Sequence, residues 1–359
     1  MGNRTRTGKG SVPAIDGLKS DVLVVGGGPA GLAAAIALRL QGFSVTVADT
    51  RQPPIDAACG EGILPAGVDA LGRLGVPLGA ADGFPFRGIR FIEGAGSVEA
   101  PFSGASGIGV RRTRLHTLLT RRAMELEVRL LWGTRIAEPS SRSSFEWIVG
   151  ADGQQSAVRR SAGLGAALSL SHRFGFRRHY RLAPWTGMVE VHWGARCQFY
   201  VTPVAPDEIG VALLTRDSHL RIDAALCEFP TLSRRLANAA CTSSDRGSII
   251  STRRLWHVTR DRTALVGDAS GSLDAIAGEG LSLAFLQAHA LADAIAAGDL
   301  RAYQARHRRL ARRPLIMANL LLLLDRLSWL RPTIWRGLAL EPSLLSRVLA
   351  TYTPGGRLA

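Results

Sequence analysis

The start of the chain alternates short apolar runs with an Ala- and Leu-rich stretch. Residues Asp21–Val25 form a β-branched run that ends in glycines, and Ser44–Ala48 form a second such run. Between them, Pro29–Gln41 have helical spacing, and Gly42 closes the helix. The pattern predicts a strand, a helix and a second strand, which together make a βαβ unit.

Two further apolar runs lie far along the chain and end in the same way. Phe145–Val149 leads into Gly150-Ala151-Asp152-Gly153, and Thr263–Val266 leads into Gly267-Asp268. Both runs have the length of buried strands in a parallel sheet. Ligands of open α/β sheets lie at the carboxyl ends of the strands, so we expect the two aspartates to project toward a ligand.

The segments between these strands have a different residue pattern, in which short runs of alternating apolar and polar residues are separated by Pro, Gly and Asp turns. They predict an antiparallel sheet over 87–93, 187–193, 198–202 and 209–215. After Gly278 the pattern becomes helical over 281–297 and 299–313, followed by shorter helices broken at Pro314, Pro332 and Pro342.

The pattern as a whole predicts an α/β protein in which a Rossmann-type domain carries an inserted antiparallel β-sheet substrate domain and a helical C-terminus. The Rossmann-type domain is expected to be discontinuous, over 21–80, 106–165 and 255–300. The substrate domain is expected over 81–105 and 166–254, and the C-terminal helices over 301–359. Residues 1–20 are polar, basic and Gly-rich, and we expect a disordered arm there.

A glycine motif stands between the first strand and the first helix. Gly26-Gly27-Gly28-Pro29-Ala30-Gly31 fits the pattern GxGxxG. Gly26 suits a tight turn, Gly28 lets backbone approach a pyrophosphate, and Gly31 permits close packing of helix and strand. Asp49 ends the second strand, where a carboxylate can accept hydrogen bonds from both ribose hydroxyls of an adenosine. Together these features predict a dinucleotide site with its pyrophosphate at the helix N-terminus.

The net charge of the chain suggests a polyanionic partner. The 359 residues include 44 Lys and Arg against 29 Asp and Glu, for a net charge of +15. Such a charge is typical of proteins that bind nucleic acid or anionic membranes. Lys9 and Lys19 are the only lysines, however, and the arginines are scattered along the chain and form no single patch. We therefore expect no nucleic-acid partner.

Cysteine spacing, the N-terminus and the C-terminal helices add three expectations. The four cysteines form no CxxC pair, so no metal site is expected. Residues 1–20 lack the apolar stretch of a signal peptide, which makes the cytoplasm the default compartment.

The basic stretch 301–313 and the apolar run Leu315–Leu324 are typical of a solvated helix followed by a segment too short to span a bilayer. The alternative is that 301–324 contact an anionic membrane and make the protein membrane-peripheral.

Two downstream motifs resemble those of a known flavoprotein family. The segment 150–159, GADGQQSAVR, resembles the GADGxxSxVR motif of the para-hydroxybenzoate hydroxylase superfamily. Gly267-Asp268-Ala269-Ser270-Gly271, continuing to Gly278-Glu279-Gly280, resembles its GDA motif at the flavin ribityl chain. With the first glycine motif, the three stand in the family's order over residues 21 to about 300. The resemblance implies an FAD-dependent oxidoreductase that holds FAD non-covalently and takes electrons from NAD(P)H.

The same resemblance implies a set of FAD contacts. Asp268 would accept hydrogen bonds from ribityl hydroxyls. Arg112 precedes Leu115 and Leu119 in an element similar to the family's R-x-x-L-x-x-x-L, whose arginine reaches toward the flavin phosphates. Asp152 has two compatible interpretations, a contact to FAD or the nicotinamide path and a cap of the helix near 155–161. The full set is Gly26, Gly28, Pro29, Ala30, Gly31, Asp49, Arg112, Asp152, Gly267, Asp268, Gly278, Glu279 and Gly280.

The superfamily contains aromatic hydroxylases, flavin halogenases and geranylgeranyl-reductase-like enzymes. The chain lacks the WxWxIP motif and the active-site lysine by which halogenases resemble each other, so halogenation is not expected. Gly271 and Ala275 stand where hydroxylases carry His and Pro, and Cys59-Gly60-Glu61-Gly62 is similar to a loop of the reductases. The segment 198–203, QFYVTP, lacks the Trp and Phe of the reductases' YxWxFP motif.

We therefore expect an NAD(P)H-dependent monooxygenase that hydroxylates an aromatic or polyketide-like small molecule through a flavin C4a-hydroperoxide. The alternative is a flavin-dependent reductase of an isoprenoid or another apolar alkene, and a second alternative is a non-catalytic flavin-binding protein. The catalytic residues stay unassigned, with Cys59, Glu61 and Tyr200 as candidates.

Overall fold

The computed structural model describes residues 20–136, 144–165 and 167–327, and also 329, 331, 333, 334 and 337. Apart from residue 20, the arm expected over residues 1–20 lies outside the described residues. Within the described part, the strands form a six-stranded, an eight-stranded and a three-stranded sheet. This arrangement confirms the predicted α/β class, with a mostly parallel sheet and a separate, mostly antiparallel one.

The nucleotide-binding sheet has the strand order β16-β17-β9-β1-β2-β8, and of its described strands only β16 runs antiparallel to its neighbour. Parallel pairing brings the carboxyl ends of β1, β2, β9 and β17 to one edge of the sheet. This is the edge at which an open α/β sheet binds its ligand. The strands are β1 (Val22–Val25), β2 (Val45–Asp49), β8 (Arg129–Trp132), β9 (Trp147–Gly150), β16 (Thr259–Arg260) and β17 (Thr263–Leu265).

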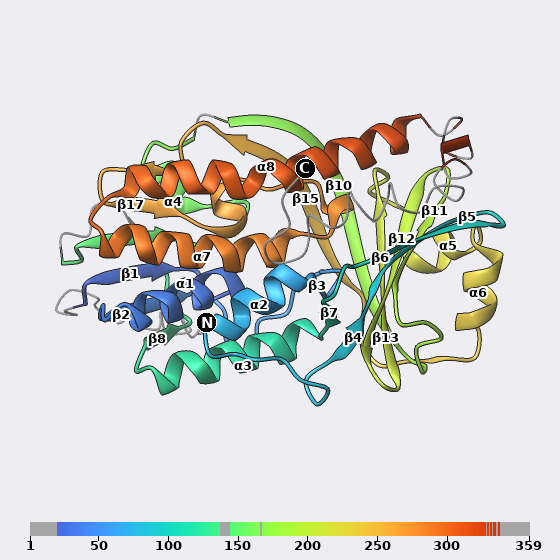
Figure 1. The fold of residues 1–359 in the computed structure, drawn as a ribbon, viewed down its shortest axis with the longest axis horizontal. Coiled ribbons are helices and arrows are strands. Elements are labelled where there is room, and N and C mark those ends of the chain that lie inside the picture. Colours follow the sequence, from blue (N-terminus) through green and yellow to red (C-terminus); the bar gives the residue numbers. More distant parts are fainter. Residues whose placement is uncertain are drawn as a thin grey trace, which may run out of the picture.

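Three helices pack together beside this sheet. α1 (Pro29–Leu40) contacts both α3 (Arg112–Glu125) and α7 (Gly280–Ala296), and the three lie close together in Figure 1. Their buried side chains, such as Leu32 and Phe285, form one apolar cluster with the strands. α1 and α7 are rich in alanine, and small side chains let two helices approach closely.

The substrate-domain sheet has the order β14-β10-β13-β12-β11-β5-β6, with β15 paired to β10. Its described pairs are antiparallel except for β5 with β11, which corrects the expectation of a purely antiparallel sheet. β5 comes from an earlier stretch of chain than β11, so no hairpin turn connects the two strands and their pairing can be parallel. The strands are β5 (Gly88–Glu93), β6 (Gly96–Pro101), β10 (Ala167–Arg181), β11 (Val189–Trp193), β12 (Cys197–Ala205), β13 (Glu208–Thr215), β14 (Ala240–Cys241) and β15 (Arg246–Leu255).

Short elements cover and connect the two large sheets. α5 (Ile222–Leu226) and α6 (Pro230–Leu236) bury Ile222 and Leu232 in a cluster with Phe199 and Val211 of the substrate-domain sheet. The remaining elements are the strands β3 (Gly62–Ile63), β4 (Phe84–Phe86) and β7 (Gly107–Gly109) of the small sheet, the helices α2 (Pro65–Arg73) and α4 (Ala157–Ser161), and the 3-10 turns η2 (Gly267–Ser270) and η3 (Ala275–Ala277).

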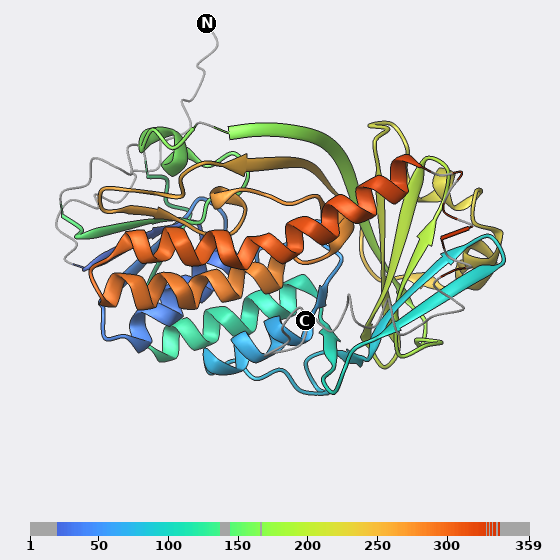
Figure 2. The ribbon, with the colours of Figure 1, turned by 45° about the horizontal axis from the view of Figure 1, so that its top comes forward.

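The C-terminal helix α8 (Leu300–Arg326) continues through Pro314, so the predicted break at that residue is wrong. Proline removes a backbone hydrogen bond, but packing on both sides of it holds the helix together. On the N-terminal side, the buried Tyr303 hydroxyl donates to the carbonyl of Leu265 at 2.7 Å. On the C-terminal side, Leu321 and Leu324 join the apolar cluster under the substrate-domain sheet. α8 thus spans both halves of the molecule (Figures 1 and 2), while Pro332 and Pro342 lie outside the described residues.

Candidate functional site

A cavity of about 810 Å³ begins at the carboxyl edge of the nucleotide-binding sheet and continues under the substrate-domain sheet. Its volume falls within the range of cavities that bind cofactors and drug-sized ligands. Every FAD contact implied by the sequence lines it, with the exception of Gly31. The structure therefore gathers residues from four stretches of the chain around one space.

Five of the glycines implied as FAD contacts divide into two kinds. A Cβ on Gly31 would lie 1.8 Å from the carbonyl oxygen of Gly26, and a Cβ on Gly26, whose φ is +109°, would lie 2.3 Å from the carbonyl oxygen of Ala151. These two glycines are required by the protein's own backbone. By contrast, a Cβ on Gly28, Gly278 or Gly280 would meet no protein atom within 4 Å, although the φ of +66° at Gly278 also favours glycine. Because Gly28, Gly278 and Gly280 line the cavity, the open space beside them fits a bound pyrophosphate and flavin.

The carboxylate of Asp49 is fully engaged within the protein. Its Oδ2 accepts the N–H of Gly27 at 2.8 Å, and its Oδ1 accepts the N–H of Arg51 at 2.8 Å. The guanidinium of Arg51 also donates to both oxygens, at 3.1 and 3.0 Å. Burial opposes the charge, but these hydrogen bonds outweigh it and hold the pKa of Asp49 below its ordinary value. Sequence reasoning missed Arg51, whose half-exposed side chain must turn aside before an adenosine ribose can reach both oxygens.

Asp49→Ala is expected to lower FAD affinity by on the order of 2 to 4 kcal/mol, because two charge-assisted hydrogen bonds to the ribose are lost. Arg51→Ala removes the competing guanidinium and keeps both acceptor oxygens, so its effect should be within about tenfold. Fluorescence titration of the flavin-free variants with FAD measures both. Equal, wild-type affinity in the two variants would mean that Asp49 does not hold the ribose.

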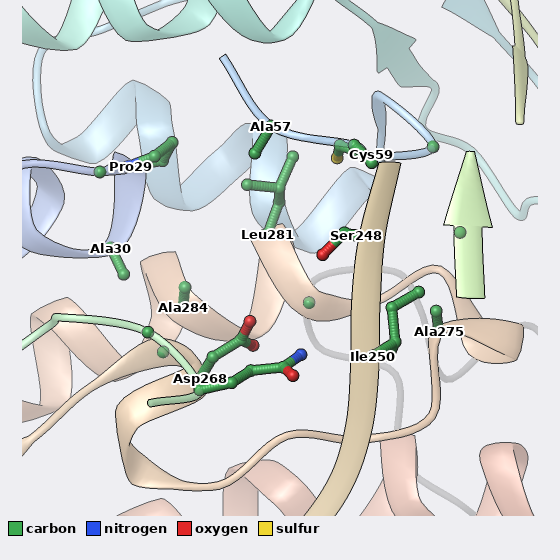
Figure 3. A pocket seen from close by; sticks show the side chains of 18 of the residues that line it. Pro29, Ala30, Ala57, Cys59, Ser248, Ile250, Asp268, Ala275, Leu281 and Ala284 are labelled. Carbon is green, nitrogen blue, oxygen red and sulfur yellow. The ribbon is translucent and has the colours of Figure 1, made fainter. Parts of the chain in front are cut away.

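Asp268 and Arg112 face the middle of the cavity. Figure 3 shows the Asp268 carboxylate pointing into the cavity from the loop that follows β17. Asp268 is exposed to the cavity, but the surrounding protein desolvates its carboxylate and raises its pKa, and the nearby Arg112 only partly offsets this effect. The Nε of Arg112 is buried and has no hydrogen-bond partner among the described residues. A donor left unpaired at the wall of a cavity points to an anionic ligand group such as a phosphate.

The structure shows one of the two roles that the sequence left open for Asp152. Its Oδ2 accepts the N–H groups of Ala157 at 2.6 Å and Val158 at 3.2 Å, so it caps α4. Its Oδ1 is buried without a hydrogen-bond partner in the described part of the chain, and the residue lines the cavity. A contact of Asp152 to a bound cofactor stays a prediction.

Glu61 positions the arginine that faces the cavity. Its Oε1 accepts the N–H of Arg112 at 2.8 Å, at the first residue of α3. Its Oε2 lies 2.6 Å from Nε2 of His179, and both side chains are buried. The residue holds a positive φ of 60°, a strained conformation for a side chain other than glycine. Sequence reasoning listed Glu61 among catalytic candidates but did not pair it with His179, which lies 118 positions away.

The other two catalytic candidates are held in their protonated forms. Burial raises the pKa of the Cys59 thiol, which lines the cavity near the flavin end (Figure 3). Burial also raises the pKa of Tyr200, whose hydroxyl donates to the carbonyl of Ile276 at 2.9 Å. Neither side chain is therefore suited to act as a base at neutral pH. Their catalytic roles stay predictions.

The far end of the cavity is apolar. Side chains from the substrate-domain sheet, the small sheet, η3 and α8 line it, and Figure 3 shows Ile250 of β15 and Ala275 of η3 in its wall. The aromatic rings among them suit a flat ring in the ligand. The apolar lining consists mainly of Phe86, Ile89, Phe91, Val189, Val191, Leu214, Ile250, Ile276, Met317 and Leu321.

Comparison with known proteins agrees with the FAD interpretation of the site. Residues 19–176 match the family model described as an FAD binding domain. A menaquinone reductase of Mycobacterium tuberculosis is 34% identical over 168 residues, which are 45% of this chain and 41% of that protein. The match thus spans less than half of the length of that relative.

Solved structures share the fold along nearly the whole chain. The flavin-dependent brominase Bmp2 has a TM-score of 0.78 at 20% identity, covering 95% of this chain and 96% of that one. The p-nitrophenol 4-monooxygenase PnpA from Pseudomonas putida DLL-E4 has a TM-score of 0.76 at 15% identity, covering 93% and 97%. At these identities the likeness establishes the fold and leaves the reaction open.

Proposed function

We propose that this chain, which has the FAD-binding domain and the fold of the para-hydroxybenzoate hydroxylase-type FAD oxidoreductases, is a monooxygenase of an apolar aromatic substrate. The observation that carries the proposal is that the nucleotide end of the cavity opens directly into an apolar end lined by aromatic rings. Flavin-dependent oxygen transfer needs a substrate held beside the flavin where bulk water is excluded. FAD would supply the redox chemistry when bound.

The chain's own residues would hold the cofactor and the substrate. Arg112 and the N-terminus of α1 line the cavity and would hold the pyrophosphate, and Asp268 would accept hydrogen bonds from the ribityl chain. α7 begins at Gly280, so its first N–H groups favour negative charge at the flavin's pyrimidine end. The donor would be NAD(P)H that docks transiently, because the sequence has no second GxGxxG motif. Beyond residue 19 the sequence contains no lysine, which argues against halogenation.

The test supplies the purified flavoprotein with NAD(P)H and a panel of phenols that carry alkyl chains. A substrate should speed NAD(P)H oxidation, and mass spectrometry under ¹⁸O₂ should find one labelled oxygen atom in the product. A matched anaerobic reaction should give no product. Flavin that NAD(P)H never reduces would instead favour a non-catalytic role.

Reduction of an apolar alkene is a second candidate, favoured by two observations. The relative from Mycobacterium tuberculosis carries the name menaquinone reductase. Cys59, whose thiol keeps its proton because burial raises its pKa, lies in the cavity wall. Adding hydride to one alkene carbon requires a proton for the other, and a neutral thiol can donate it and regain it from solvent. A prenylquinone that is reduced equally well without oxygen would replace the monooxygenase by this function, and Cys59→Ala should then slow the reaction by about tenfold or more.

A further inference from the structure

The outer face of the second half of α8 carries an apolar stripe. Ile316, Leu320 and Leu323 are 54%, 44% and 52% exposed. Their spacing of four and three residues places them side by side on one helix face. Trp329, just beyond the helix, is 73% exposed. Monomeric soluble proteins rarely leave such a continuous apolar surface in water, and it marks a contact site.

The same helix face is basic toward its N-terminal end. Arg309 and Arg312 are exposed and lie seven and four residues before Ile316, on the same face. α8 contains seven arginines and one acidic residue, Asp325. That aspartate forms ion pairs with Arg173 and Arg216, at 2.7 and 2.6 Å. The positive charge of the helix is thus not compensated from within it.

We propose that this face of α8 docks on the surface of an anionic lipid bilayer. A helix with arginines along its rim and aliphatic and tryptophan side chains beside them has the chemistry of an interfacial helix. The lipid headgroups complement the arginines and the net charge of +15, while Ile316, Leu320 and Leu323 enter the boundary of the acyl chains. Among the described residues no helix is both long and apolar enough to cross a bilayer, so the contact lies on the membrane surface.

An adjacent face of the same helix lines the cavity. Met317 and Leu321 stand in its apolar wall. One turn of α8 thus contributes both to the cavity wall and to the exposed apolar stripe. This position suits a substrate dissolved in the membrane. That last point rests on the proposed function, whereas docking itself does not.

The test sediments the FAD-loaded protein with phosphatidylcholine vesicles that contain either no phosphatidylglycerol or about a third of it. The protein should pellet with the anionic vesicles and should bind the neutral ones at least tenfold more weakly. Raising the salt from low to high concentration should release part of the bound protein, because screening weakens the attraction of the arginines.

Two variants with matched controls locate the contact. Ile316→Ser with Leu320→Ser and Leu323→Ser should weaken vesicle binding by about tenfold or more. Its control carries Leu40→Ser, Met124→Ser and Ile249→Ser, three residues of similar exposure on other elements, and should bind as the wild type does. Arg309→Glu with Arg312→Glu should also weaken binding, while Arg121→Glu with Arg262→Glu should weaken it less. Thermal melting and bound flavin check that each variant is folded.

Three results would overturn the proposal. Wild-type protein that stays in the supernatant with anionic vesicles at low salt shows that the face is not a lipid surface. Equal binding by the α8 serine variant and its control moves the contact elsewhere. A dimer in size-exclusion chromatography that only the α8 serine variant dissociates shows that the face binds a second copy of the chain. None of these results depends on turnover, so each is independent of the outcome for the proposed function.

Discussion

Gly28→Ala is expected to leave the fold intact and to weaken FAD binding by about 10- to 100-fold, the penalty of about 1 to 3 kcal/mol for an extra methyl group in a close contact. The backbone of Gly28 has φ −71° and ψ 178°, which alanine adopts without strain. Its added Cβ would meet no protein atom within 4 Å, and the space that it enters is where the pyrophosphate is expected. Stability should change by less than about 1 kcal/mol.

Gly31→Ala is the matched comparison, and it should lower the stability of the fold itself. Its Cβ would lie 1.8 Å from the carbonyl oxygen of Gly26, so backbone must move whether or not FAD is present. We expect a loss of at least about 3 kcal/mol of stability in the flavin-free protein. Thermal melting of both flavin-free variants, followed by titration with FAD, separates the two effects. If Gly28→Ala binds FAD as tightly as the wild type does, the pyrophosphate does not pass this residue.

Asp268→Asn is expected to weaken FAD binding and at the same time to stabilise the flavin-free protein. The loss in affinity should be on the order of 1.5 to 3 kcal/mol, because the ribityl hydroxyls lose a charged acceptor. The gain in stability at pH 7 should be small, because Asp268 is exposed to the cavity and solvent screens its charge. The gain arises because enclosure by protein disfavours the charged form of Asp268.

The sign of the pH dependence follows from the raised pKa of Asp268. The folded protein holds this proton more tightly than the unfolded chain does, so ionisation of Asp268 destabilises the fold as pH rises above about 4, the ordinary value for aspartate. The stabilising effect of Asp268→Asn should therefore be present at pH 7 and should vanish below about pH 4. Melting temperatures of the flavin-free proteins at both pH values test this. A variant that is less stable than the wild type at pH 7 would contradict it.

Local patterns were enough to predict the nucleotide-binding part of the molecule. The β-branched runs that precede Gly26, Asp152 and Asp268 became neighbouring parallel strands, so these residues came to one edge of the sheet. The prediction succeeded because a glycine turn and a strand end are conditions on a few consecutive residues. The break at Pro314 was predicted wrongly for the converse reason, since packing against distant elements outweighs the local cost of proline in α8.

The contacts that position the candidate site residues could not be predicted in this way. Glu61 reaches the N–H of Arg112 and the ring of His179 across 51 and 118 positions. No periodicity pairs such residues, because a pattern of apolar and polar positions says which face of an element is buried and not what buries it. Arg51 was missed although it is only two residues from Asp49, because an arginine in a loop is usually solvated.

The sequence by itself therefore determined four strands of the nucleotide-binding sheet, the helix α1, and the glycines and acids at the sheet's edge, since backbone conformation and strand ends are encoded locally. Only the tertiary structure decided the shape and apolar lining of the cavity, the partner of each buried charge and the outward face of α8. Each of these depends on which distant side chains fill the same space, and such contacts exist only once the chain has packed.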